Sequence, residues 1–368
     1  MKNKIVFGSW EAITVLINLI FAQAFLTFPR DMAYFGGSAG WMIPIVMTAA
    51  ILIYFAIMTA FYERIGSLDL LDICERAGGR VLKVICGLVI MLFLVAYSAV
   101  ALGGFSQTLK IVSLDKSPLR FVELIFFAGI VASAYFGIEA VVRINAILIP
   151  LVVIGFLLIT LGIIPKFHIN NLFPVLGNGY MSIARGSLYK LSVFSPLLIF
   201  FFMVPFFKKR YIKRVGYLSI IISGVLLLWS TLSFLLLFPY HIAADKRIPV
   251  FQMAKHIEFG SFIQRIESIF VLICSVSSLL YLSILFTFTI HVVKKTLGLK
   301  KIKPVILSMA VIVFSLADIL KRMNLDIIST GGSNFIWLAG LLPPAVILII
   351  GAAKKVKEKD TEGGRQDG

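Results

Sequence analysis

The stretch Asn18-Leu-Ile-Phe-Ala-Gln-Ala-Phe-Leu-Thr-Phe-Pro-Arg30 lies inside the first apolar segment of the chain, between Trp10 and Phe35. Pro29 has no backbone N–H, so it cannot bond the carbonyl of Phe25, and its ring crowds that carbonyl. In lipid, a freed carbonyl needs another partner, so such a break persists only where it faces protein or a polar cavity. Proline also merely kinks many membrane helices. This stretch alone therefore does not distinguish a broken helix from a kinked one.

The composition places this stretch in a membrane protein. Hydrophobic residues make up 60% of the 368 residues and charged residues only 14%, against about a quarter in average soluble domains. Repeated apolar runs of roughly 20 residues match the hydrocarbon thickness of a bilayer. The sequence therefore predicts an all-α polytopic membrane protein.

The distribution of the basic residues indicates an orientation in the membrane. The net charge is +17, but Lys and Arg gather in short clusters between the apolar runs, as the positive-inside rule requires, and this disfavours a nucleic-acid partner. An even number of spans places both termini on one side, which the basic clusters predict to be the cytoplasm. We expect ten transmembrane helices, near residues 10–35, 40–62, 81–109, 119–137, 142–163, 185–207, 216–239, 262–293, 304–320 and 334–353.

Ten spans divide into five and five, and the sixth carries a second break, Lys190-Leu-Ser-Val-Phe-Ser-Pro196. Pro196 is expected to free the carbonyl of Ser192. Breaks in the first and sixth spans suggest a 5+5 inverted repeat with broken helices 1 and 6. The expected division is a first five-helix repeat (1–163), an extracytoplasmic connecting segment (164–184), a second repeat (185–353) and a charged cytoplasmic tail (354–368).

Two breaks that meet at mid-bilayer would form a small polar site. Helix N-termini attract a carboxylate, and free carbonyls attract an ammonium or a metal cation. An amino acid carries both charges and would fit such a site. Sugars and inorganic ions are not excluded by this argument.

Four stretches resemble a known family: Leu26–Arg30, Asn170–Gly179, Arg265–Ser268 and Lys294–Leu299. In them the chain resembles the permease-like B subunits of spore-germination nutrient receptors, a branch of the amino acid–polyamine–organocation (APC) transporters with the LeuT-like fold. The resemblance implies a nutrient-sensing subunit in the inner membrane of a dormant bacterial spore. It also implies a larger membrane A subunit and a lipoprotein C subunit as partners, with germinant binding triggering ion release.

The first break departs from the family pattern. Family members usually have glycine there, where this chain has Ala22, Gln23 and Ala24. Alanine permits close approach but resists unusual dihedral angles, and Gln23 adds a donor and an acceptor. The departure leaves room for a ligand other than the simple amino acids that many members sense.

The expected ligand site lies at mid-bilayer between the breaks of spans one and six, walled by spans three and eight. Its residues are Ala22, Gln23, Ala24, Phe25, Tyr97, Ser192, Phe194, Ser195, Ser278 and Tyr281. Structural or partner roles are expected for Pro29, Pro196, Arg30 (capping carbonyls or pairing with Asp31), and Arg265 with Glu267 (an interfacial ion pair or a contact to a partner subunit).

The sequence contains no catalytic set, cofactor fingerprint or metal-ligand spacing, so no enzyme activity, cofactor or metal is expected. Three functions remain: a germinant receptor subunit, a secondary transporter moving an amino acid with a proton or sodium, and a scaffold whose site no longer binds. The apparent lack of a mid-membrane acid in spans one, six and eight disfavours a proton-driven transporter. Expected contacts are a small nutrient, membrane lipid and the partner subunits.

Overall fold

Glycines end several of the apolar helices. The helix Met42–Ile65 stops before Gly66, and the helix Leu119–Phe136 stops before Gly137, both with positive φ (108° and 88°). A residue without a Cβ adopts this backbone conformation without steric cost, which terminates a helix. The turn residues of the sequence therefore set these boundaries.

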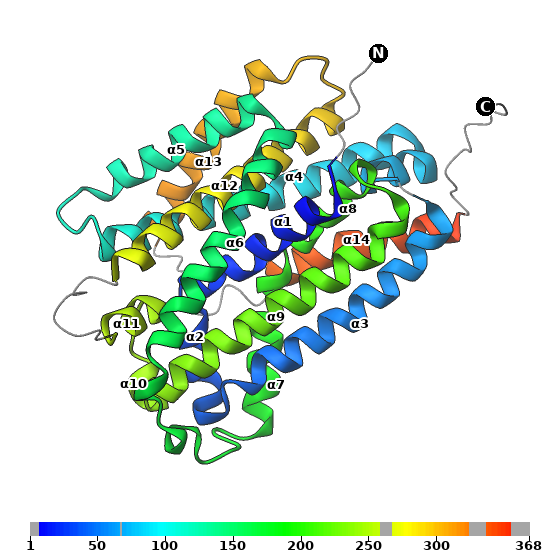
Figure 1. Ribbon diagram of the computed structural model, residues 1–368. Helices are drawn as coiled ribbons and strands as arrows, with labels where there is room; N and C mark the ends of the chain where they lie inside the picture. Colours follow the sequence, from blue (N-terminus) through cyan, green and yellow to red (C-terminus); the bar gives the residue numbers. More distant parts are fainter. Residues whose placement is uncertain (1–6, 67, 258–266, 324–335, 355–368) are drawn as a thin grey trace, which may run out of the picture.

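The computed structural model describes residues 7–66, 68–257, 267–323 and 336–354, and these residues form only helices and their connections (Figure 1). The prediction of an all-α protein is confirmed. The α-helices are α1 (Ser9–Phe21), α2 (Phe28–Gly36), α3 (Met42–Ile65), α4 (Leu70–Val112), α5 (Leu119–Phe136), α6 (Ile138–Gly162), α7 (Tyr180–Lys190), α8 (Leu197–Met203), α9 (Ile212–Leu237), α10 (Tyr240–Ala243), α11 (Pro249–Lys255), α12 (Glu267–Leu297), α13 (Lys303–Arg322) and α14 (Ile336–Ala353).

The candidate membrane spans follow the predicted order. Within the described residues, 8 helical segments are long and apolar enough to cross a membrane, and the bent pair Ser9–Phe25 and Phe28–Ala39 makes up to 9. The tenth predicted span corresponds to α14, whose apolar part Ala339–Ala353 is shorter. The sixth span begins at Tyr180, ahead of its predicted start at residue 185. The chain is a multi-pass integral membrane protein.

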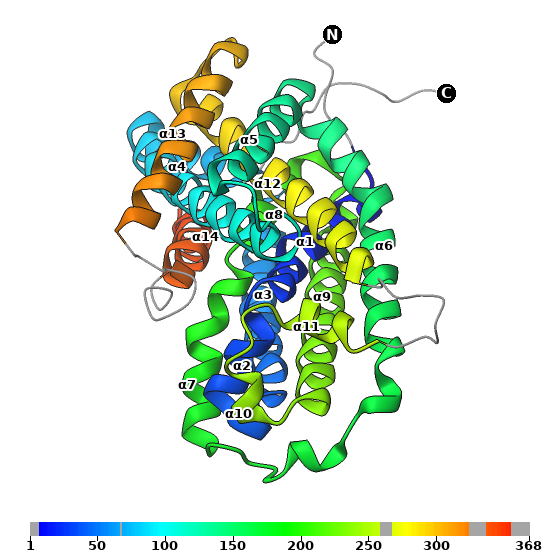
Figure 2. The same ribbon diagram turned by 90° about the vertical axis from the view of Figure 1, so that its left-hand side faces the viewer.

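The two interrupted spans form the centre of the bundle. Every residue of α8 is buried, as are all residues of α1 from Ala12 to Phe21. In contrast, α5 and α13 are each only 28% buried over their most apolar stretch, and they lie side by side at one edge (Figures 1 and 2). Their exposed apolar side chains suit contact with lipid. Polar backbone exposed by the interruptions is thus enclosed by protein, as a membrane interior requires.

The bundle has two distinct ends. The short helices α10 and α11 gather with α2 and α7 at one end, here called the short-helix end (Figures 1 and 2). The start of α1 and the end of α14 lie at the other end, called the basic end because its loops contain Lys208–Arg214 and Lys294–Lys303. We predict that the basic end faces the cytoplasm.

Candidate functional site

The first interruption separates α1 from α2 by a 3₁₀ turn, Ala22–Phe25, and a bend of 64°. Leu26 follows with ψ −115°, outside the helical region. Among the described residues, no backbone hydrogen bond uses the Leu26 carbonyl or the Thr27 N–H. Pro29 lies in the first turn of α2, where its missing N–H is not needed. The break therefore leaves backbone acceptors and donors, among them the Leu26 carbonyl and the Thr27 N–H, for another partner.

The second interruption is milder, and its tight turn supplies a partner for the Ser192 carbonyl. A 3₁₀ turn, Leu191–Phe194, joins α7 to the Ser195-Pro196 step before α8. The Ser195 N–H donates to the Ser192 carbonyl at 3.0 Å, so the expectation that Pro196 leaves this carbonyl free is wrong. The tighter turn supplies a donor one residue earlier than an α-helix would. Instead, the buried Ser195 hydroxyl has no hydrogen-bond partner among the described residues.

Three polar side chains converge beside the first interruption. The Gln23 Nε2 donates to the Tyr281 hydroxyl at 3.2 Å, and the Tyr97 hydroxyl lies within hydrogen-bonding reach of both. Tyr281 is fully buried, whereas Gln23 and Tyr97 keep some exposure. They come from spans one, eight and three, so this group can bond a polar ligand from three sides.

Helix α14 connects the second interruption to these side chains. A Cβ built on Gly340 would lie 2.6 Å from the Ser195 Cβ and 3.0 Å from the Phe93 ring. The Phe93 ring in turn stacks on Tyr97, with centroids 5.4 Å apart. Sequence reasoning did not include α14 as a wall of the site. Gly340 was the available signal, because a missing Cβ permits this close approach.

The other predicted site residues lie around this centre. Ser278 donates its hydroxyl to the Cys274 carbonyl one turn earlier in α12, so that donor is used within its own helix. The Phe25 ring makes edge contacts with Phe156 and Phe270, at centroid distances of 6.4 Å and 6.1 Å. The remaining three are fully buried: Ala22, Ala24 and Phe194.

Of the two residues expected to contact a partner subunit, Arg265 lies outside the described residues. Glu267 is the first residue of α12 and is partly buried. Their role in complex formation stays a prediction.

A buried charged cluster, which sequence reasoning missed, links the two interruptions. Lys190, the last residue of α7, donates from Nζ to Asp31 Oδ2 at 2.7 Å. Arg30 pairs with the other oxygen, Asp31 Oδ1, at 3.1 Å, and the Thr27 hydroxyl donates to Oδ2 at 2.8 Å. In the sequence, Asp31 stood out only as a partner for Arg30, and Lys190 only as the start of the second break.

A second missed cluster lies one turn before the first interruption. The Asn18 Nδ2 donates to Asn145 Oδ1 at 3.2 Å, and the Ser277 hydroxyl donates to Asn18 Oδ1 at 2.8 Å. All three residues are buried and join α1, α6 and α12. An asparagine within an apolar run was the signal, because a buried amide needs partners. The cluster fixes the end of α1 that carries the interruption.

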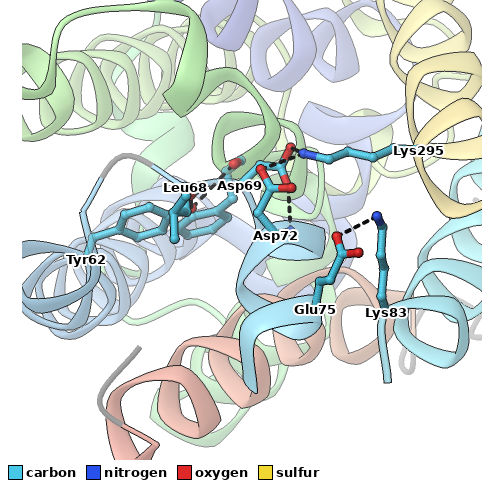
Figure 3. A network of polar contacts seen from close by, with 8 residues as sticks. Tyr62, Leu68, Asp69, Asp72, Glu75, Lys83 and Lys295 are labelled. Carbon is cyan, nitrogen blue, oxygen red and sulfur yellow. Dashed lines mark hydrogen bonds and ion pairs between the residues drawn. The ribbon is translucent and has the colours of Figure 1, made fainter. Parts of the chain in front are cut away.

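The basic end of the bundle contains an ion-pair network (Figure 3). Lys295 of α12 pairs with Asp69 and, at 2.6 Å, with Asp72. Asp69 also caps α4 by accepting from the Asp72 N–H at 2.9 Å, and the Tyr62 hydroxyl donates to the Leu68 carbonyl at 3.0 Å. The network therefore ties the α3–α4 connection to α12.

Replacing Lys295 with methionine is expected to destabilise the folded protein by about 2–3 kcal/mol, because the buried Asp69 loses its cation. The loss should be smaller than for a fully buried pair, since Lys295 is partly exposed. Thermal unfolding of the purified protein in detergent measures it, with the exposed Lys301→Met as the control. Equal unfolding temperatures for both variants would show that the network does not stabilise this end.

Comparisons with known proteins give a consistent result. A sequence family described as spore germination protein matches residues 9–325. Spore germination protein A2 of Bacillus subtilis (strain 168) is 23% identical over 356 residues, covering 95% of this chain and 96% of the relative. Spore germination protein B2 of the same organism is 22% identical and covers 58% of each chain.

The fold is similar to that of a solved transporter. Mhp1, a nucleobase-cation-symport-1 family transporter in a closed conformation with bromovinylhydantoin bound, superposes with a TM-score of 0.63. The match covers 96% of this chain and 91% of Mhp1 at 10% sequence identity. The inward-facing conformation of Mhp1 gives a TM-score of 0.56. This likeness establishes an APC-type, LeuT-like fold.

Proposed function

Because this chain belongs to the spore germination protein family, we propose that it is the germinant-sensing subunit of a spore germination receptor. In this proposal a small nutrient, such as an amino acid, binds between the two interrupted spans. Binding changes the conformation of the bundle, and the change passes to a larger membrane A subunit and a lipoprotein C subunit. The complex would reside in the inner membrane of the spore, and the subunit itself would catalyse no reaction.

One observation carries the proposal: unpaired backbone at Leu26 and Thr27 lies in the same break as Gln23, which bonds Tyr281. Unpaired backbone groups inside a membrane protein cost free energy unless something bonds them. A ligand with its own donors and acceptors would bond these groups and the neighbouring amide and hydroxyls. Ligand binding would therefore give the interruption a function that offsets its free-energy cost.

The second candidate is a secondary transporter, favoured by the fold shared with Mhp1, whose structure is described as that of a cation symporter. A shared fold alone does not decide between receptor and transporter. Asp31, the buried acid of the first broken span, is already paired with Lys190 and Arg30. It is therefore poorly suited to carry a transported proton, which favours the receptor.

The test compares spores with and without this protein in a panel of amino acids, sugars and nucleosides. We expect at least one nutrient to trigger germination only when the protein is present. Purified protein in lipid vesicles, given the same labelled nutrient, should show binding without accumulation. Concentrative uptake driven by a proton or sodium gradient would instead establish the transporter.

A further inference from the structure

One side of α9 joins two arginines to an apolar surface. Residues spaced by three or four positions share one side of a helix. The side chains at this spacing, here called the α9 stripe, are Arg210, Arg214, Leu218, Ile221 and Val225. Arg210 precedes α9 in a 3₁₀ turn, and the other four lie in the helix itself. The stripe therefore begins with charged residues at the basic end and continues with apolar ones.

The apolar part of the α9 stripe is not covered by the bundle. Ile221 and Val225 are 44% and 58% exposed, although α9 packs against α1 and α3 (Figure 1). From Arg214 to Val225 the helix advances about 16 Å at 1.5 Å per residue. This length is close to half of the roughly 30 Å hydrocarbon core of a bilayer. The stripe therefore spans one leaflet, with its arginines at the level of the lipid headgroups.

The two arginines carry charges that no described side chain neutralises. Arg210 donates from Nη2 to the Tyr211 hydroxyl at 2.6 Å, and its guanidinium lies 4.6 Å from the centre of the Tyr211 ring. Tyrosine is enriched at membrane–water interfaces, which suits this position. Arg210 and Arg214 are both exposed, and neither forms an ion pair within the described part of the chain.

A phosphate group fits this pair of arginines. Like charges four positions apart on a helix repel each other, so an anion between them relieves an unfavourable interaction. Guanidinium groups bind phosphate through paired N–H donors. Anionic lipids are a component of the cytoplasmic leaflet, the side that the basic end is predicted to face. A phospholipid supplies both the phosphate and an acyl chain for the apolar part of the stripe.

We propose that the α9 stripe binds an anionic phospholipid of the cytoplasmic leaflet, with the phosphate between the two arginines and an acyl chain along the three apolar side chains. The lipid is anionic rather than zwitterionic, because the ammonium of a zwitterionic headgroup would face the arginines and be repelled. The bound lipid holds the connection between the interrupted sixth span and α9. This inference does not depend on the nutrient, so its test is separate from that of the proposed function.

The experiment measures binding of dioctanoyl phosphatidylglycerol and dioctanoyl phosphatidylcholine to the purified full-length protein in a neutral detergent by native mass spectrometry. The two lipids share acyl chains and a phosphate, but only phosphatidylglycerol has a net charge. Each basic residue near an anionic headgroup contributes roughly 5-fold in affinity, so we expect phosphatidylglycerol to bind its tightest site roughly 25-fold more tightly. The double variant Arg210→Gln with Arg214→Gln should remove this preference. The matched control, Lys116→Gln with Arg247→Gln, removes two exposed charges elsewhere and should keep it.

Two further measurements separate a lipid from a soluble anion. Glycerophosphoglycerol, the headgroup without acyl chains, should not displace the lipid at equal concentration. The double variant Ile221→Ser with Val225→Ser should bind both lipids more weakly and keep the preference for phosphatidylglycerol. Equal binding of the two lipids by the wild type, or an unchanged preference in the arginine variant, would overturn the inference. So would an equal loss in the control, displacement by the soluble headgroup, or wild-type lipid binding by the serine variant.

Discussion

Replacing Asp31 with asparagine is expected to lower the free energy of unfolding by about 3–5 kcal/mol. The substitution keeps the shape of the side chain but leaves Lys190, with a side chain only 9% exposed, without an anion. Arg30 loses both of its contacts to the carboxylate at the same time. Because these residues join α2 to α7, the loss should loosen the contact between the two interrupted spans. Thermal or denaturant unfolding in detergent measures the effect.

Two further variants separate the ion pair from the substitution itself. Asp115→Asn, at an exposed turn, should leave the unfolding temperature unchanged. The double variant Asp31→Asn with Lys190→Met removes both buried charges and should recover part of the lost stability. If Asp31→Asn unfolds like Asp115→Asn, the pair does not hold the spans together.

Replacing Gln23 with leucine is expected to raise the half-maximal nutrient concentration roughly 5- to 150-fold, or to abolish the response. Leucine has a similar size but no amide, so the bond to Tyr281 and any bond to the ligand are lost. The protein should still reach the membrane in normal amounts, because one neutral hydrogen bond contributes little to folding. Dose–response curves of spores, at matched protein levels, measure the shift.

The control for Gln23→Leu is Phe61→Leu. Phe61 lies in the uninterrupted helix α3 and packs partly buried against the core. We expect its variant to give the wild-type curve. An unmoved curve for Gln23→Leu at normal protein levels would place the ligand elsewhere.

Local chemistry made the interruptions predictable. Pro29 and Pro196 remove backbone donors inside apolar runs, and in the structure each follows a 3₁₀ turn, Ala22–Phe25 and Leu191–Phe194, by a few residues. The all-α class and the order of the spans followed from runs of about 20 apolar residues. The hydrogen-bond partner of the Ser192 carbonyl could not be predicted, because a proline shows which backbone bond is lost but not which bond of a tighter turn replaces it.

The charged and amide clusters could not be predicted for a different reason. Lys190 and Asp31 are 159 positions apart, and Asn18 and Ser277 are 259 apart. Nothing in the local sequence pairs such residues, because their contact depends on how the spans pack. The sequence signal was limited to polar residues placed where burial is costly. Each such residue needs a partner, and only the packed bundle identifies which one.

The most direct test of the central claim is a structure of the protein bound to the nutrient identified in the spore panel. The account predicts ligand density between the two interruptions, in contact with the Leu26–Thr27 backbone and with Gln23 or Tyr281. Density at another surface of the bundle, with the interruption empty at saturating nutrient, would contradict it.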